Sequence, residues 1–504
     1  MSASAVDFND VAVDFNDVQG IVRFGYRRLS EACYLLLKIR DAAAARSWLA
    51  NAPVSTAADL GEAPKTALQL AFTAEGLRAL GVPHNVLAGF SAEFLSGMTG
   101  EDSRSRRLGD TGANAPQYWR WGAEERVPHL VAMLYAQPGN LQSWMGTIET
   151  GSWSDAFEVI DCLSTSDLRG IEPFGFVDGI SQPTLDWERQ RSPKGDQIEY
   201  SNLVSLGDFL LGYPNEYGKY TDRPLLSAQE PASSNLSIAE DAPDMRDLGR
   251  NGTYLVFRQL EQDVRGFWRF LDEQAAANPQ ARQSLGEAMV GRRMSGDPLL
   301  PLSDQSIAGT DAQSVAQNQY TYDSDGDGTR CPFGAHVRRA NPRNADLPDR
   351  PANPFSWLLH TLGFSSKGLR DDVEASTRFH RLLRRGREYG PGLSPEQAIA
   401  DGPDTAEHGI HFISIGANIA RQFEFVQNAW LMNTKFDAMT EESDPLLGNR
   451  TPVEGCPFTN TFSMPQERGV RDRVMALPQF VTVRGGAYFF LPSMKALRYF
   501  SALG

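Results

Sequence analysis

Two segments far apart in the chain share one pattern, a strand followed directly by a helix. In the first, the apolar run at residues 34–39 precedes an alanine-rich helix at 41–50, whose first residue is an N-capping aspartate. In the second, a strand at residues 253–260 precedes a helix at 262–271. The matching spacing indicates an internal duplication, so we expect two α+β halves.

Further elements follow from local sequence signals. Near the end of the chain, residues 480–483 and 488–491 are predicted to form a hairpin that turns at Gly485-Gly486, and Ser493 is predicted to open the last helix. Apolar side chains at helical spacing form one stripe, which we interpret as core packing of an amphipathic helix: Ile419, Phe423, Val426 and Trp430.

The duplication divides the chain at a long connection. Residues 186–250 are rich in Asp, Ser, Pro, Gly and Asn, so we assign them to this connection. The N-terminal half is then 18–185 and the C-terminal half is 251–504. The hexapeptide Val-Asp-Phe-Asn-Asp-Val occurs twice in succession near the N-terminus, and residues 1–17 are predicted to be a disordered acidic tail.

The composition restricts partners and location. With 48 basic and 63 acidic side chains the net charge is −15, which repels phosphate backbones and argues against nucleic acid as a partner. The N-terminus has neither the basic start nor the apolar run of a secretory signal, and no segment has the length of a membrane span. The chain is therefore predicted to be cytoplasmic and to have no membrane partner.

Four cysteines are spread along the chain, at positions 33, 162, 331 and 456. They are too sparse for a disulfide framework and lack the paired spacing of a metal site. Cys331 and Cys456 each precede Pro-Phe, and we interpret both as buried packing thiols.

Residues 331–343 combine one histidine with closely spaced proline, glycine and arginine. Pro332 and Pro342 restrict the backbone on either side, and Gly334 allows a close approach two residues before His336. A stiff segment thus aims the imidazole, which makes His336 the candidate metal ligand. The alternative is a packing or surface histidine, since the chain has seven.

A second stretch, residues 174–183, places Asp178 between Gly175 and Gly179 among apolar residues. We expect this carboxyl group to be partly desolvated, which raises its pKa and suits a proton shuttle. The glycines leave room for a cofactor plane or a small oxidant. A simple turn is the alternative interpretation.

These stretches, with Arg384-Arg-Gly at 384–386 and the segment 409–425, resemble the dye-decolorising peroxidases, a haem family with a ferredoxin-like fold. The resemblance runs from Val18 to the end of the chain and is strongest to the larger branch, which carries extended loops. It implies an α+β fold with two ferredoxin-like domains, antiparallel sheets and peripheral helices. Haem b would lie between the halves, bound mainly by the C-terminal one.

The resemblance also implies a role for each site residue. His336 would be the proximal iron ligand, and Asp444 would accept a hydrogen bond from its second ring nitrogen. Asp178 would move the proton between the peroxide oxygens, and Arg384, preferred to Arg385, would stabilise the departing negative charge. The alternatives are a helix or turn cap for Asp444 and a solvated basic turn for the arginine pair.

Four further residues are predicted to bind the cofactor. Ile410 and Phe412 alternate on an apparent strand and would face the haem, or else belong to the ordinary core. Arg338 and Arg421 would pair with the haem propionates, because a guanidinium suits a carboxylate. For Arg338 a surface salt bridge is the alternative.

The resulting prediction is a haem peroxidase, monomeric or homodimeric. Hydrogen peroxide would oxidise the haem to a ferryl intermediate, and dyes, phenols or other aromatic donors would reduce it again, large donors through a surface Trp or Tyr. The alternative is a haem-binding or iron-release protein of the same fold without significant turnover. A structural protein without haem is a third interpretation.

Overall fold

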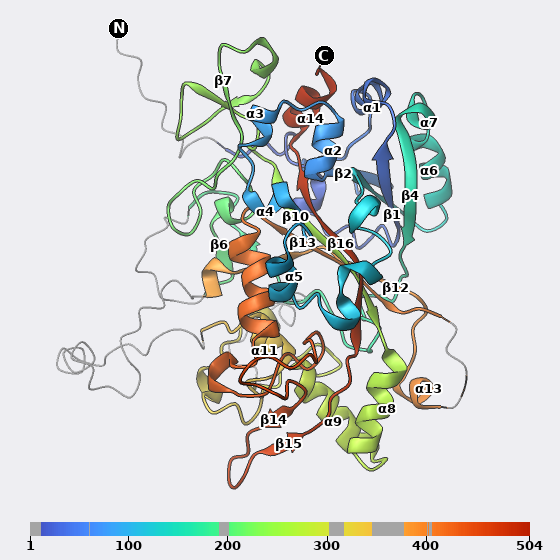
Figure 1. The fold of residues 1–504 in the computed structure, drawn as a ribbon, viewed down its shortest axis with the longest axis vertical. Helices are drawn as coiled ribbons and strands as arrows, with labels where there is room; N and C mark the ends of the chain where they lie inside the picture. The colour runs from blue at the N-terminus through green and yellow to red at the C-terminus, as the bar shows by residue number, and fades with distance from the viewer. Residues whose placement is uncertain are drawn as a thin grey trace, which may run out of the picture.

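An antiparallel sheet of nine strands forms the centre of the structure (Figure 1). The computed structural model describes residues 12–59, 61–190, 201–301, 317–344, 377–400, 402 and 406–503. The strands are β1 (Glu31–Ile39), β2 (Thr66–Phe72), β3 (Leu130–Ala136), β4 (Phe157–Ser164), β10 (Thr253–Gln262), β11 (Leu383–Arg384), β12 (Arg387–Tyr389), β13 (Gly409–Gly416) and β16 (Val481–Leu491). Their order is β11-β13-β10-β16-β2-β3-β1-β4, and β12 pairs with the other end of β13.

Helices pack against this sheet, so the predicted α+β class is observed. They are α1 (Ala42–Leu49), α2 (Ala74–Ala79), α3 (His84–Leu87), α4 (Ala92–Ser96), α5 (Asp102–Leu108), α6 (Leu141–Ile148), α7 (Trp153–Ala156), α8 (Val264–Gln274), α9 (Pro279–Val290), α11 (His336–Ala340), α13 (Pro395–Ile399) and α14 (Met494–Ser501). The predicted caps are present, because Asp41 accepts a hydrogen bond from the amide of Ala44 and Ser493 accepts one from that of Ala496.

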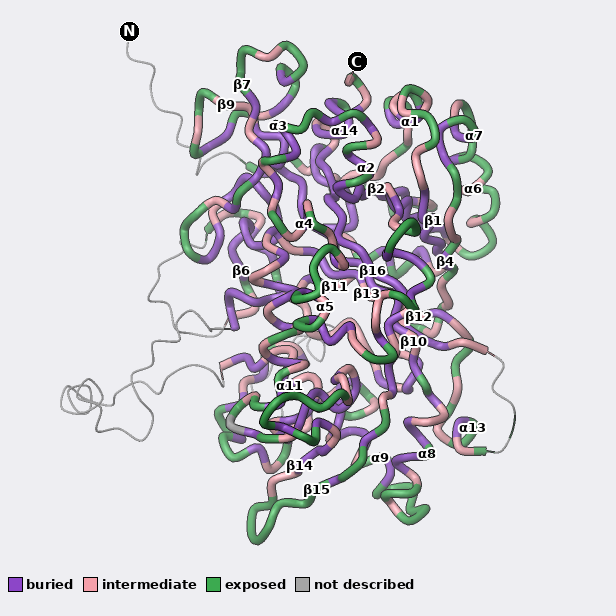
Figure 2. The backbone as a smooth tube through the Cα atoms, in the orientation of Figure 1, coloured by how far each residue is buried: buried purple, intermediate pink, exposed green. Residues whose placement is uncertain are grey.

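Both faces of the sheet are buried, as Figure 2 shows for the central strands. Successive side chains of a strand point to opposite faces. Leu35 and Leu70 belong to a core that helices such as α1 and α8 complete, whereas Tyr34 and Ala71 pack against the N-terminal segment and residues 204–213. This arrangement explains why every residue of β3 is buried.

Residues 204–213 of the predicted connection 186–250 therefore cover one face of the sheet, whereas Leu226, Leu236 and Leu248 belong to the core on the other face. The described residues of the connection form the strands β6 (Leu203–Val204), β7 (Leu225–Ser227), β8 (Ser237–Ile238) and β9 (Met245–Asp247), while residues 191–200 lie outside the described ranges. Strand β6 pairs with β5 (Thr184–Leu185), which directly precedes the connection. A last short pair, β14 (Phe462–Met464) with β15 (Asp472–Val474), projects at the lower end of Figure 1.

The two halves of the chain meet where β16 pairs with β2. The register at this junction contains one residue pair, Phe490 opposite Phe72. Both side chains are fully buried, and the ring of Phe490 packs edge-on against Phe90 at a centroid distance of 4.8 Å. Side-chain packing thus contributes more than backbone pairing to this junction, and the division into two domains stays a prediction.

The predicted acidic tail of residues 1–17 is wrong for its second part. Residues 1–11 lie outside the described ranges, but Val13 and Asp17 are buried. The Asp17 carboxylate accepts hydrogen bonds from the side chain of Asn251 and the backbone amide of Lys495, each at 2.8 Å. The second copy of the hexapeptide is therefore held by the start of α14 and by Asn251, the first residue after the connection.

The predicted hairpin at residues 480–491 is also wrong, because β16 runs straight through Gly485-Gly486. A Cβ on Gly485 would lie 2.5 Å from Trp121 Nε1, and one on Gly486 would lie 2.8 Å from Met98 Sδ. These glycines allow close packing against the strand and do not form a turn.

The apolar stripe near residue 420 is buried as predicted, but its helix has wider turns than an α-helix. Residues Ala420–Glu424 and Val426–Met432 are π-helical.

Within the ranges that the structure describes, every helix is too short or too polar to cross a membrane.

Phe490→Ala should lower the free energy of unfolding by about 3–5 kcal/mol, because it opens a cavity where the two halves meet. Urea denaturation of the haem-free protein measures this loss. The matched control is Phe458→Ala, since that ring is 55% exposed and its removal should change stability by less than about 0.5 kcal/mol. Equal losses in the two variants would contradict a junction built on side-chain packing.

Candidate active site

A cavity of about 240 Å³ lies between the sheet and α11, and it contains most of the predicted site residues. His336 lines one part of its wall, and Asp178 and Arg384 line another. The rest of the wall is mainly apolar and includes Val290, Val337, Leu382, Phe423, Val426, Leu431, Leu446, Val481 and Val483. Strands β10, β13 and β16 contribute to it, so the cavity belongs mainly to the C-terminal half.

His336 is the first residue of α11, and a buried carboxylate holds its ring. Nδ1 lies 3.0 Å from Oδ2 of Asp444, whose side chain is fully buried. The other carboxylate oxygen accepts the amides of Leu446 and Leu447 at 2.9 and 2.8 Å. Asp444 thus caps a turn and orients the imidazole at once, which leaves Nε2 for the cavity.

The same contact sets the charge of this pair. Burial lowers the pKa of His336, but the attraction and hydrogen bond of Asp444 outweigh it, so the pKa lies above its usual value. For Asp444, burial raises the pKa, and His336 with the Leu447 amide brings it below its usual value. Asp444 is therefore an anion that favours a proton on Nδ1.

Asp178 and Arg384 form an ion pair, with 2.9 Å between Oδ1 and Nη1. Gln182 supports it, because its amide group exchanges two hydrogen bonds with the backbone of Arg384. The loop reaches this position through Gly175 and Gly179, whose φ angles are 99° and 78°.

The expected rise in the pKa of Asp178 is wrong in sign. Burial does raise it, but the charge of Arg384, the amide of Gly179 and the charge of His336 bring the pKa below its usual value. Asp178 and His336 are close enough for each to shift the pKa of the other. The two predicted groups therefore face one cavity, which their positions in the chain could not establish.

Asp178 and Arg384 also line a second cavity of about 1240 Å³. It is open to the surface and is bordered by the segment 23–30 and by residues within 54–59 and 61–66. Ile410 and Phe412 line both cavities, in agreement with their predicted alternation on β13. These four residues thus form the boundary between the inner cavity and the surface.

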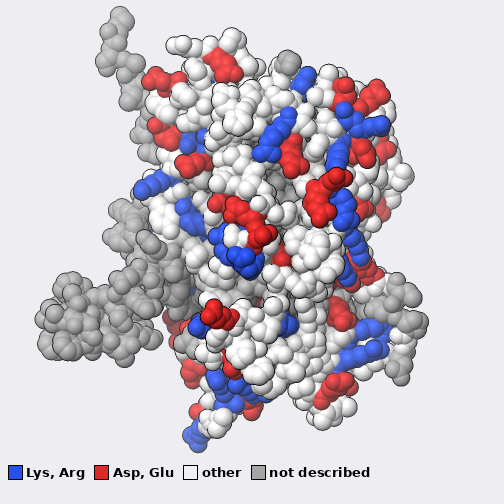
Figure 3. Space-filling view, in the orientation of Figure 1, with Lys and Arg blue, Asp and Glu red and all other residues white. Residues whose placement is uncertain are grey.

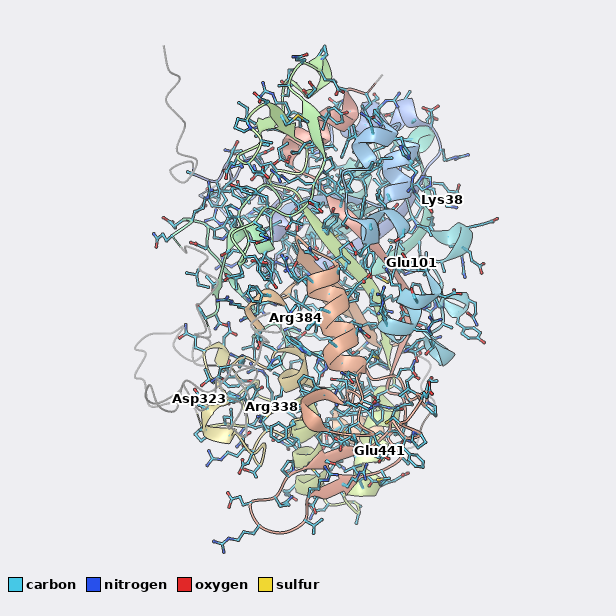
Figure 4. All side chains as sticks on the ribbon, turned by 60° about the vertical axis from the view of Figure 1, so that its left-hand side comes forward. Lys38, Glu101, Asp323, Arg338, Arg384 and Glu441 are labelled. Carbon is cyan, nitrogen blue, oxygen red and sulfur yellow. The ribbon has the colours of Figure 1, made fainter. Side chains whose placement is uncertain are left out.

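Arg338 and Arg421 do not line the inner cavity, so their predicted contact with a cofactor is not supported. Arg338 is buried against Asp325 with an N–O distance of 2.9 Å, and Arg421 lies 3.5 Å from Asp208. Residues two apart on a helix face different sides, so α11 turns Arg338 away from the side of His336. Figure 4 shows Arg338 well separated from Arg384.

Arg292 is a cavity residue that sequence reasoning missed. Its guanidinium donates to the carbonyls of Gly296 and Gln317 and to the hydroxyl of Ser181. Among the described residues no carboxylate pairs with it, and burial lowers its pKa, as does the charge of Arg343. Arg381 lines the same cavity. The basic pair Arg292-Arg293 was the available signal.

Glu172 is a second missed residue. It lines the cavity, and its carboxylate accepts the amides of Phe174 and Phe176 at 3.0 Å and the side chain of Gln262 at 2.9 Å. Burial raises its pKa to about 7 although these hydrogen bonds lower it. Glu172 therefore positions the turn that leads to Asp178. The sequence indicates this residue only through Glu172-Pro173, an acid followed by proline that lies six residues before Asp178.

The residues of the cavity fit a haem. Its apolar walls suit a porphyrin plane, and the free Nε2 of His336 suits an iron. The unmatched charge of Arg292 suits a propionate. Asn341 Oδ1 and Arg258 Nε are buried there without a partner among the described residues.

Known proteins with the same fold resemble this chain over nearly its full length, although no protein-family model matches it. The chain is 27% identical over 516 residues to dye-decolorizing peroxidase msp1 of Mycetinis scorodonius, covering 97% of this chain and 88% of that protein. A solved dye-decolorizing peroxidase in complex with 2,6-dimethoxyphenol is 25% identical, with a TM-score of 0.70 and coverage of 97% of this chain and 100% of that one. A third protein is a dye-decolorizing peroxidase whose heme pocket was engineered for asymmetric sulfoxidation. Its solved structure is 26% identical, with a TM-score of 0.71 and coverage of 97% of this chain and 100% of that one.

Asp444→Asn should lower the pKa of His336, because the charge that outweighs burial is lost while the amide keeps the shape. Histidine-selective NMR titration of the haem-free protein measures the shift. Asp472→Asn, on the exposed strand β15, is the control and should leave the pKa of His336 unchanged. An unchanged His336 pKa in Asp444→Asn would show that Asp444 only caps the turn.

Proposed function

We propose that this peroxidase, whose homologues and structural neighbours are dye-decolorizing peroxidases, is a haem b enzyme that uses hydrogen peroxide to oxidise dyes, phenols and other aromatic donors through a ferryl intermediate. One observation carries the proposal. An apolar cavity has a histidine held by a buried carboxylate in one wall and an aspartate paired with an arginine in another. A site that only stores haem has no need of the second pair.

Three groups of residues would hold the cofactor. His336 would bind the iron through Nε2, the apolar walls would contact the porphyrin, and Arg292 with Arg381 would face the propionates. Haem supplies the redox chemistry when it is bound. The anionic Asp444 would make the imidazole a stronger electron donor, which favours peroxide cleavage over simple binding.

Asp178 would act as the acid and base toward peroxide. Its lowered pKa keeps the carboxylate ionised near neutral pH, so it can accept the proton of the bound peroxide. A weak base returns that proton readily, here to the departing oxygen. Arg384 holds Oδ1 of Asp178 and would place its positive charge beside the oxygen that becomes negative.

The second cavity would admit peroxide, since it reaches Asp178 and Arg384 from the surface. Ile410 and Phe412 narrow the boundary, so large aromatic donors would react elsewhere, through a surface Trp or Tyr.

The face in Figure 3 carries acidic and basic side chains close together. A cytoplasmic location, a monomer or homodimer, and the lack of nucleic-acid and membrane partners stay predictions.

His336→Ala should lose most of its bound haem, because residues 331–343 contain no other histidine that could take the place of its Nε2. Haem titration followed by absorption spectroscopy measures the binding. His84→Ala lies on α3, away from the cavity, and is the matched control. Full occupancy with an unchanged spectrum in His336→Ala would remove His336 from the iron.

Arg384→Leu should keep haem but slow the reaction with peroxide by roughly 10²–10³-fold, as for the loss of one electrostatic contact. Asp178→Asn should slow it by roughly 10²–10⁴-fold, since an amide cannot accept the proton. In the wild type the rate should fall as acid protonates Asp178. Without Arg384 the pKa of Asp178 rises, so this acid limb should move to higher pH.

Stopped-flow mixing with peroxide across the acid range measures both effects. Arg385→Leu is the comparison, because its guanidinium binds the carbonyls of Ile21 and Val22 and does not line the inner cavity. Wild-type rates in both site variants would reduce Asp178 and Arg384 to residues that shape the cavity. A haem-loaded wild type that does not turn over with peroxide would favour the alternative, a haem-binding or iron-release protein without significant turnover.

A further inference from the structure

Two cysteines far apart in the sequence meet at the edge of the sheet. Cys33 lies on β1 and Cys162 on the neighbouring edge strand β4. In the antiparallel register Cys33 is opposite Ser164 and Cys162 is opposite Leu35, so both side chains lie on one face. Their Sγ atoms are 2.6 Å apart. Nothing in the spacing of the four cysteines predicted this pair.

We infer that Cys33 and Cys162 form a redox site that hydrogen peroxide, or another hydroperoxide, converts into a disulfide. A disulfide bond is about 2.05 Å long, so the sulfur atoms need to approach by only about half an ångström. The strands are already paired on either side of the two cysteines. The bridge can therefore form without a change of fold.

The reaction is a two-electron oxidation. The Cys162 thiolate attacks one oxygen of the peroxide, the O–O bond breaks, and Cys162 becomes a sulfenic acid while hydroxide leaves and takes up a proton. Cys33 Sγ then attacks the sulfenic sulfur, the S–S bond forms, the S–O bond breaks, and the proton of Cys33 leaves with the oxygen as water. Two thiols and one peroxide give one disulfide and two water molecules.

The environment assigns the two roles. Cys162 is exposed and meets peroxide first, whereas Cys33 is 2% exposed and resolves the sulfenic acid. The hydrogen bond between the two thiols lowers the pKa of Cys162, although burial and the charges of Asp161 and Glu149 raise it. The same hydrogen bond and burial raise the pKa of Cys33. The acidic neighbours make this a slower thiol than one beside a cation.

The other two cysteines have no such arrangement. Cys331 and Cys456 are buried, and each thiol contacts a backbone carbonyl, that of Gly291 or of Phe458. Burial raises the pKa of Cys331 to about 12, so it stays a thiol. They are internal controls for selective oxidation.

A bridge would fasten the edge strand of the sheet. Within the described residues β4 pairs only with β1, and the segment that leads to Glu172 and Asp178 follows its last residue, Ser164. Locking Cys162 to Cys33 opposes local opening of this edge. The site does not include the inner cavity, so the inference does not rest on the proposed peroxidase mechanism.

The test exposes the reduced, haem-loaded full chain to a few equivalents of hydrogen peroxide and maps its peptides by mass spectrometry without reductant. We expect one cross-linked peptide pair, Cys33 with Cys162, and a fall from four to two in the thiols that titrate in denaturant. Dithiothreitol should reverse it, and the bridged protein should have a higher thermal midpoint than the reduced one.

Variants separate the steps. Cys33→Ser should leave a sulfenic acid at Cys162 that dimedone traps, Cys162→Ser should abolish the bridge, and Cys456→Ser should bridge like the wild type. All three should keep the wild-type peroxidase rate. Haem-deficient His336→Ala should still form the bridge, so a failure of the proposed function leaves this test readable.

Three results would overturn the inference. One is four free thiols after peroxide has been consumed. Another is sulfinic acid at Cys162 without a bridge, and the third is cross-linking between chains in place of the internal pair.

Discussion

Burial of the central sheet on both faces is the constraint on which the other features depend. Strands with two buried faces need two covering layers, and the N-terminal segment with residues 204–213 supplies one of them. Asp17 fixes the N-terminal segment in this layer, because its carboxylate accepts hydrogen bonds from Asn251 and from the amide of Lys495 in α14. The end of β10 and the beginnings of β13 and β16 form one wall of the inner cavity, and other segments, α11 among them, form the rest.

The cavity combines two opposed pairs of charges within an apolar wall. The carboxylate of Asp444 lies beside the ring of His336, which can become a cation. The carboxylate of Asp178 lies beside the cationic side chain of Arg384. In both pairs the charge partner outweighs burial, so both carboxyl groups have a lowered pKa. This is the reason why an aspartate can stay ionised at neutral pH while it lies in a largely apolar cavity.

Local signals predicted much of the fold. The strand–helix units at β1–α1 and β10–α8 are present close to their expected bounds, because capping and apolar periodicity act over a few residues. The prediction of a hairpin at Gly485-Gly486 was wrong, because a glycine pair is as typical of a turn as of a strand that another side chain approaches closely. The contacts with Trp121 and Met98, which only the structure shows, decide for the second. The prediction that the second hexapeptide is disordered was also wrong, because its partners Asn251 and Lys495 lie far along the chain and no local signal indicates them.

The sequence by itself determined the kinds of group in the site and the stiff, glycine-flanked segments that carry His336 and Asp178. Only the tertiary structure decided which charged groups face the cavity. Arg338 and Arg292 look alike in the sequence, yet a short helix turns one toward Asp325 while the other enters the wall. Side-chain direction and long-range pairing depend on packing between distant segments, and no local pattern encodes them.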